Sequence, residues 1–142
     1  MQAVSSRRSF VTRLSGAFAA LIPMLRWRPG HRCWRRVAGP HPLPRPGITA
    51  AKVLTREQLS ESPGLIPVFD QVREIPEIVD GIRCQCGCAE LEGFYSLLSC
   101  YEGDAMARAC PICQGEGRLV ARLHRDGKTL DEIRAAIDAR YG

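Results

Sequence analysis

The chain has 142 residues, of which 45% are hydrophobic, and 20 Lys and Arg outnumber 15 Asp and Glu, which gives a net charge of +5. This length suits one domain of ordinary size and excludes two. Residues 1–52 hold ten basic residues and no acidic one, whereas residues 53–142 hold ten basic and fifteen acidic residues, so a +10 leader precedes a −5 body. Because the basic residues gather in the leader, the sequence disfavours a nucleic-acid-binding protein.

Residues 1–37 are expected to be a disordered basic leader that acts as an export signal. Residues 6–11 read SRRSFV, which resembles the twin-arginine signal, with Arg7 and Arg8 as the pair that the export machinery reads. The apolar run at 14–25 is shorter than the ~20 residues that span a bilayer and suits a signal segment. We expect an exported protein, periplasmic or at the outer face of the cytoplasmic membrane, with membrane contact only through an uncleaved leader. The alternative is a basic N-terminus of a cytoplasmic protein.

Residues 38–64 are predicted to be a linker because they contain five prolines and three glycines. Such a composition favours a stiff, extended chain over a packed one. Only residues 48–59 have the composition of a segment that could form a helix or dock on the body.

Residues 65–142 are predicted to form an all-α body, a small bundle of four or five short helices around a cysteine-rich loop. Apolar residues at spacings of three and four predict helix over 65–82, which Pro67 and Pro76 divide into two short pieces. Further helices are expected at 93–101, 104–109, 111–124 and 130–141. Pro111 suits a first helical turn, and Thr129 with Glu132 forms a capping box.

Six of the seven cysteines lie in the body, and their spacing points to a metal site. The first three follow a C-x-C-x-C pattern, which in a locally extended chain places alternate side chains on the same side. A later C-x-x-C pair stands at a predicted helix start, where the helix dipole favours thiolate. The candidate ligands are Cys84, Cys86, Cys88, Cys110 and Cys113, with Cys100 as a possible sixth.

The expected metal is copper, with zinc second, because soft thiolates select Cu(I), zinc or iron–sulfur clusters. The thiols outnumber the four that one tetrahedral ion needs, which suits a polynuclear cluster. Met106, one turn before Cys110, could add a thioether or be an ordinary core residue. His124 is interpreted as a surface residue, so a Cys₂His₂ zinc finger is disfavoured.

Other interpretations of the same cysteines stay open. An even number of thiols in a small exported domain also fits three structural disulfides. Cys100 lies in an apolar run and suits a buried apolar side chain, and Cys33 in the leader suits a single surface thiol. In a redox protein, Cys110 would be the attacking thiolate and Cys113 the resolving thiol.

Four segments together resemble the bacterial PCYCGC-motif (CYCxC) family of small exported or lipid-anchored proteins, which have no established activity. This chain departs from the family pattern at Arg83, Gln85 and the Phe94–Tyr95 pair, where relatives have proline, an aromatic residue and histidine. The segments are RCQCGC at 83–88, SLLSCY at 96–101, CPICQGEG at 110–117 and GKTLDEIRAAIDARYG at 127–142.

A second, partial resemblance joins CPICQ at 110–114 and the C-terminal helix to the small helical thiol oxidoreductases of cytochrome c maturation. Those proteins lack the C-x-C-x-C element, and the resemblance implies reduction of apocytochrome thiols in the periplasm. Our first hypothesis is a non-enzymatic, exported metal-binding protein, which would hand metal to an exported receiving protein. The alternative is a thiol–disulfide oxidoreductase.

Overall fold

The computed structural model describes residues 39–142 and confirms an all-α fold for this part of the chain. The export signal with Arg7 and Arg8, and also Cys33, lie outside the described residues. Among those described, the only β pairing is an isolated bridge between Val53 and Glu102. The helices are η1 Pro63–Leu65, α1 Ile66–Glu74, α2 Pro76–Asp80, η2 Cys88–Glu90, η3 Leu98–Tyr101, η4 Met106–Arg108, α3 Pro111–Arg125 and α4 Leu130–Tyr141, where η marks a 3₁₀ helix.

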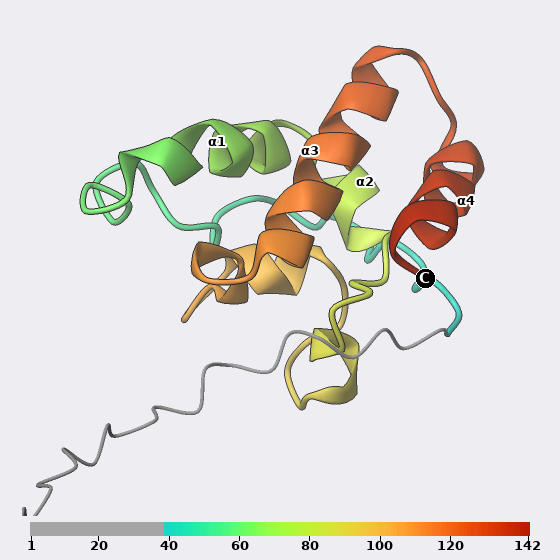
Figure 1. Cartoon of the computed structure of the whole chain (residues 1–142), viewed down its shortest axis with the longest axis horizontal. Helices are drawn as coiled ribbons and strands as arrows, with labels where there is room; N and C mark the ends of the chain where they lie inside the picture. The colour runs from blue at the N-terminus through green and yellow to red at the C-terminus, as the bar shows by residue number, and fades with distance from the viewer. Residues whose placement is uncertain (1–38) are drawn as a thin grey trace, which may run out of the picture.

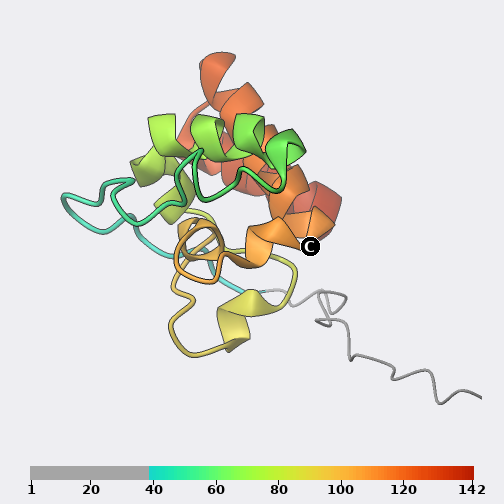
Figure 2. The same cartoon turned by 90° about the vertical axis from the view of Figure 1, so that its left-hand side faces the viewer.

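Helix α3 is the centre of the fold, with α1 packed on one side and α4 on another (Figure 1). Each helix buries one apolar stripe, because residues three and four positions apart share a helix face. Figure 2 shows the loop of residues 81–97 below these helices. The buried helical positions are Val68, Phe69 and Val72 of α1, Cys113, Glu116, Gly117, Val120 and Ala121 of α3, and Ile133 and Ile137 of α4.

The predicted helix boundaries at proline and at the capping box are confirmed. Pro76 opens α2 directly after α1 ends, and Pro111 opens α3 with Cys110 as its N-cap. The Thr129 side chain accepts from the Glu132 amide and the Glu132 carboxylate accepts from the Thr129 amide, which closes the capping box of α4. Local chemistry at these positions sets the helix ends.

The helices expected at 93–101 and 104–109 are shorter than predicted and are single 3₁₀ turns. The backbone adopts positive φ at Gly93, Gly103 and Ala105, and a residue in this conformation cannot continue a right-handed helix. These breaks confine the helical turns to η3 and η4. The sequence prediction was wrong here because it followed apolar composition alone.

The segment before α1 is packed, in contrast to the extended linker that its composition predicts. Val53, Leu54 and Leu59 are buried in the core. Arg45 reaches Asp80 at the end of α2, and Arg134 of α4 donates to the Pro42 carbonyl at 2.7 Å. These contacts hold residues 42–59 against the helices.

Asp80 is the main polar anchor of this segment. The carboxylate is fully buried and accepts from the Arg45 amide at 2.8 Å, from the Arg45 guanidinium and from the Ser96 hydroxyl at 2.7 Å. Burial raises the pKa of Asp80, but the hydrogen bonds from Arg45 and Ser96 outweigh it, so the pKa lies below its usual range. Asp80 is therefore a paired buried carboxylate, as burial of a charge requires.

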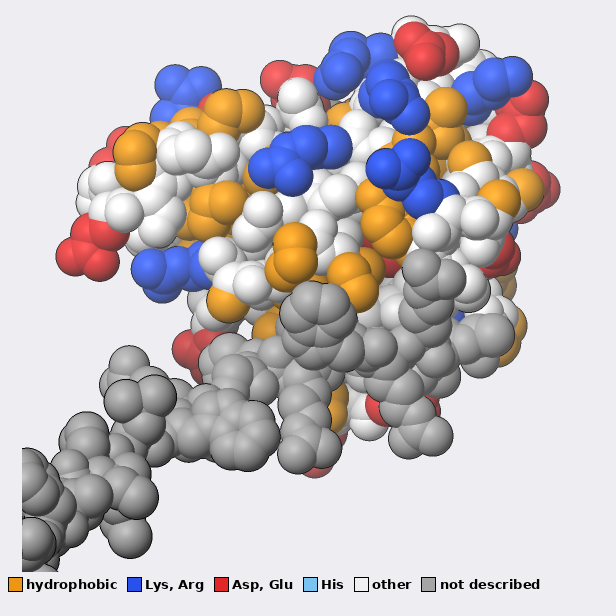
Figure 3. Space-filling model, viewed as in Figure 1, with side chains coloured by type: hydrophobic (Ala, Val, Ile, Leu, Met, Phe, Trp, Pro, Cys, Tyr) orange, Lys and Arg blue, Asp and Glu red, His pale blue; other side chains and the backbone are white. Residues whose placement is uncertain are grey.

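The outer surface of the helices is strongly polar. Arg118, Arg122 and Arg125 are exposed on α3, and Figure 3 shows Lys and Arg side chains gathered over the part of the molecule where α3 and α4 lie. None of the helices described is long and apolar enough to cross a membrane. The six cysteines of residues 39–142 lie on the opposite, inner side of α3.

Candidate metal centre

Six thiols converge at the inner side of α3, each at most 3% exposed. Their sulfur atoms form two overlapping groups, and within each group all sulfurs lie within 4.8 Å of one another. We call the first the four-thiol group, Cys84, Cys88, Cys100 and Cys113, and the second the three-thiol group, Cys86, Cys110 and Cys113. All six predicted ligands are thus brought together, including Cys100.

Three segments that are distant in sequence supply these thiols. The first is the loop after α2, which leads into η2; the second is η3; the third is the start of α3. The loop carries Cys84, Cys86 and Cys88, η3 carries Cys100, and the start of α3 carries Cys110 and Cys113. A metal bound at this site would therefore join the C-x-C-x-C loop, η3 and the start of α3.

The loop of the C-x-C-x-C stretch differs from the extended chain expected. Residues 85–87 form a turn, and Gly87 has φ +92°, a left-handed conformation that glycine adopts without strain. The turn places Cys84 and Cys88 in the four-thiol group and sends Cys86 to the three-thiol group. The triplet therefore contributes to both groups.

The sulfur separations suit shared metal coordination. The Cys113 sulfur lies 3.5 Å from those of Cys84 and Cys86, and the Cys84 thiol donates to the Cys86 sulfur at 3.2 Å. Metal–sulfur bonds of ~2.3 Å in a tetrahedral shell place sulfurs about 3.8 Å apart. A disulfide needs about 2.05 Å, and none joins the six cysteines of the described chain. The donors thus fit a soft metal ion without large movement.

The thiols influence one another's ionisation. Hydrogen bonds from neighbouring thiols, above all Cys100, lower the pKa of Cys86 far below its usual range and the pKa of Cys88 to about 4. Hydrogen bonding with Cys100 raises the pKa of Cys84 and of Cys113. The neighbouring thiols therefore favour the thiolate form at Cys86 and Cys88, which is the form that binds a metal.

Glu116, one turn after Cys113, is a buried carboxyl group that the sequence analysis missed. Its Oε1 accepts from the Gln85 amide at 2.8 Å, inside the C-x-C-x-C loop, and its Oε2 has no hydrogen-bond partner among the described residues. Burial raises the pKa of Glu116 to about 8, although the Cys84 thiol and the Gln85 amide act in the opposite direction. Glu116 thus holds the loop while remaining largely protonated at neutral pH.

Relative to a Glu116→Gln variant, the wild-type protein is expected to lose stability as the pH rises from about 4.5 to about 8. The folded state keeps a proton on Glu116 that the unfolded state has released, so rising pH favours unfolding. The difference has an upper bound of about 5 kcal/mol, at ~1.4 kcal/mol for each pKa unit. Urea unfolding of both metal-loaded proteins across this range measures it, and the ligand thiols common to both proteins cancel. Parallel pH profiles would contradict the prediction.

Tyr101 supports the start of α3, which is the third of these segments. The side chain is fully buried, packs edge-on against Phe69 with ring centroids 4.8 Å apart, and donates to the Cys113 carbonyl at 2.7 Å. Burial raises the pKa of its hydroxyl well above the usual value. The hydroxyl lies against Gly117, the position on α3 that leaves room for it. Tyr101 thereby fixes the position of Cys113 relative to the other thiols of the cluster.

Polar side chains connect the loop of the C-x-C-x-C stretch to α4. His41 accepts at Nδ1 from the Arg83 amide at 2.9 Å, so its Nε2 carries the proton and donates to Asp138 at 3.1 Å. Gln85 donates to the same Asp138 oxygen at 2.7 Å. The imidazole of His41 therefore binds the backbone of the C-x-C-x-C loop. In this way residues 38–64, which were predicted to be a linker, help to position the thiols.

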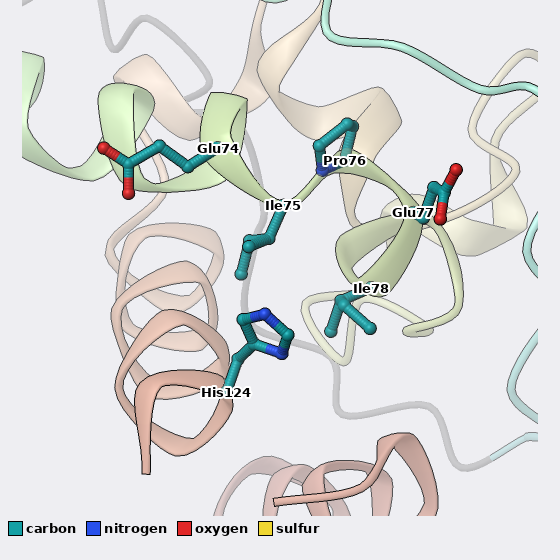
Figure 4. Close-up of a pocket in the computed structure, with 6 residues that line it drawn as sticks. All are labelled: Glu74, Ile75, Pro76, Glu77, Ile78 and His124. Carbon is teal, nitrogen blue, oxygen red and sulfur yellow. The ribbon is translucent and has the colours of Figure 1, made fainter. Parts of the chain in front are cut away.

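Met106, the possible thioether donor, and His124, interpreted as a surface residue, both lie outside the two thiol groups. Met106 is half-buried and lines a cavity of about 420 Å³ together with Phe94 and Ala109. His124 is exposed, as expected, at a second cavity of about 330 Å³ (Figure 4). There the imidazole faces Ile75 and Ile78, while the acidic side chains at the rim point away from it, so no second ligand set converges.

Comparison of the chain with models of protein families, with curated proteins and with solved structures found no match. The donors themselves therefore carry the functional interpretation. Six buried sulfurs in two groups, with an unpartnered carboxyl oxygen beside them, form a site that could hold a metal ion.

Proposed function

We propose that this chain is an exported, non-enzymatic metal-binding protein whose buried thiolates hold copper(I), with zinc as second choice. The observation that carries the proposal is the convergence of six buried sulfurs from three segments. Soft thiolates favour Cu(I) and zinc, and hydrogen bonds from neighbouring thiols favour the thiolate form of Cys86 and Cys88. The bound metal would supply cross-links between the three segments.

Burial distinguishes this function from the redox alternative. A thiol that attacks another protein's disulfide must be reached by it, and reactive cysteines are accordingly at least partly exposed. Cys110 and Cys113 are both 0% exposed, and their sulfurs face the other thiols. This arrangement favours metal binding over thiol–disulfide exchange with an apocytochrome.

The proposed export and the proposed receiving protein rest on the sequence alone. The twin-arginine route carries folded proteins, so the metal would be loaded before transport and handed to an exported receiving protein. The resemblance to the PCYCGC-motif family agrees with this proposal, because that family consists of small exported or lipid-anchored proteins.

The test is metal content and thiol protection of the full chain purified without oxygen. We expect bound copper or zinc, with the six body thiols unreactive until a chelator is added. Replacing Cys84, Cys86 and Cys113 together by serine is expected to abolish metal binding, because it leaves two donors in the four-thiol group and one in the three-thiol group. Elemental analysis and thiol counting measure both outcomes.

The matched control is Cys33→Ser, which leaves the six clustered thiols intact and is expected to bind metal as the wild type does. A metal-free protein with one easily reduced disulfide between Cys110 and Cys113 would support the oxidoreductase instead. Three disulfides resistant to mild reductant would reject both functions in favour of a structural framework.

A further inference from the structure

The cysteine cluster has two overlapping donor sets, and this overlap bears on how many ions it holds. On the basis of the proposed function, we propose that the cluster is polynuclear: it holds at least two copper(I) ions, in adjacent centres bridged by the Cys113 sulfur. One centre is the four-thiol group and the other is the three-thiol group, as defined above.

The position of Cys113 supports a bridge. Its sulfur is the one member common to both groups, and it lies 3.5 Å from Cys84 of one group and 3.5 Å from Cys86 of the other. Thiolate sulfur has several lone pairs and can bind two soft ions at once. Cys113 stands in the first turn of α3, where the helix dipole stabilises the negative charge of a bridging thiolate.

A short sulfur–sulfur distance between one member of each group also places the two centres side by side. Cys84 and Cys86 belong to different groups, yet their sulfurs are 3.2 Å apart. A single ion bound in the four-thiol group would leave Cys86 and Cys110 buried without a metal. A second ion makes use of both, and all six thiols then act as donors.

The number of donors distinguishes copper(I) from zinc. A structural zinc shell takes four protein donors, so two zinc shells that share one sulfur need seven. The cluster offers six, and no imidazole or carboxylate of residues 39–142 joins either group. Copper(I) is a soft monovalent ion that is satisfied by three thiolates. The three-thiol group therefore fits copper(I) as it stands, whereas a zinc ion there needs a second sulfur shared with the four-thiol group.

The experiment loads the anaerobic full chain with copper(I) against a competing chelator and counts ions by native mass spectrometry. X-ray absorption then shows whether copper atoms scatter from one another at bridging distance. We expect two or more ions per chain with copper–copper scattering. Zinc, tested in parallel, is expected to bind tightly as one ion, and two tight zinc ions would contradict the assignment of the three-thiol group to copper(I).

Variants of the cluster locate the ions. Cys86→Ser is expected to lower the number of copper ions but retain at least one, because the four-thiol group stays complete. Cys113→Ser should abolish copper–copper scattering, whereas Cys33→Ser should leave count and scattering unchanged. Circular dichroism of the loaded variants reports whether they fold.

The wild-type result separates the two levels of inference without relying on any variant. One copper ion per chain, or two ions without copper–copper scattering, would overturn the polynuclear cluster and leave the proposed function standing. A chain that binds no copper and no zinc would overturn both.

Discussion

Removal of the metal from the loaded protein is expected to abolish most of its helical circular dichroism. Structural metal sites made of thiolates contribute about 10–16 kcal/mol in small domains, and a whole domain of this size has a net stability of about 5–15 kcal/mol. The thiols of the C-x-C-x-C loop, of η3 and of the start of α3 meet in one buried cluster. Without the ion, the loop of the C-x-C-x-C stretch and η3 lose the cross-links that join them to α3.

A strong copper(I) or zinc chelator, added under reductant, makes this measurement in one titration. The reductant prevents disulfides from replacing the metal as cross-links. Helicity should return when the metal is restored, and the variant with Cys84, Cys86 and Cys113 all replaced by serine should resemble the chelated wild type throughout. A spectrum that does not change on chelation would show that the core folds without metal.

Gly117→Ala is expected to destabilise the loaded protein by about 2–4 kcal/mol, although alanine favours helix by about 1 kcal/mol over glycine. A Cβ at this position would overlap the Tyr101 hydroxyl and come within 2.9 Å of Tyr101 Cζ. Tyr101 is fully buried and bonded to the Cys113 carbonyl, so it cannot move without moving a ligand. Overpacking and a lost buried hydrogen bond together account for this magnitude.

The same helix offers a matched control in Gly115→Ala. A Cβ there would lie 2.5 Å from the hydroxyl of Tyr141, but Tyr141 is only half-buried near the C-terminus and can turn aside. We expect Gly115→Ala to change stability by no more than about 1 kcal/mol. Thermal unfolding compares the two variants, and Tyr101→Phe combined with Gly117→Ala should recover part of the loss. Equal effects of the two alanines would refute the role of Tyr101.

Prolines, caps and spacing were enough to predict most of the helices. Pro76, Pro111 and the Thr129 capping box act through their own backbone and nearest neighbours, so their effects can be read locally. The turns at η3 and η4 were overestimated because Ala105, an unremarkable residue in sequence, takes a left-handed conformation. Its residue type does not predict that conformation, because positive φ is uncommon outside glycine.

The residues around the thiols were harder to predict than the thiols. Cysteines at short spacing identify themselves, since few other roles require so many in so short a chain. Glu116 and His41 have no such pattern: each is an ordinary polar residue in a polar stretch. The close pair of glycines around Glu116 was the one local signal, because small residues on a helix allow close approach.

The sequence by itself determined the all-α class, the starts of α2, α3 and α4 and the six candidate ligands, because local backbone chemistry and residue type suffice for these. Tertiary structure decided how the ligands are divided. The turn at Gly87 brings Cys86 to Cys110 and Cys113 while its sulfur stays 3.2 Å from that of Cys84, and the approach of η3 to α3 brings Cys100 and Cys113 together. Spacing along a chain constrains only near neighbours, whereas a metal centre depends on distances between segments that packing alone sets.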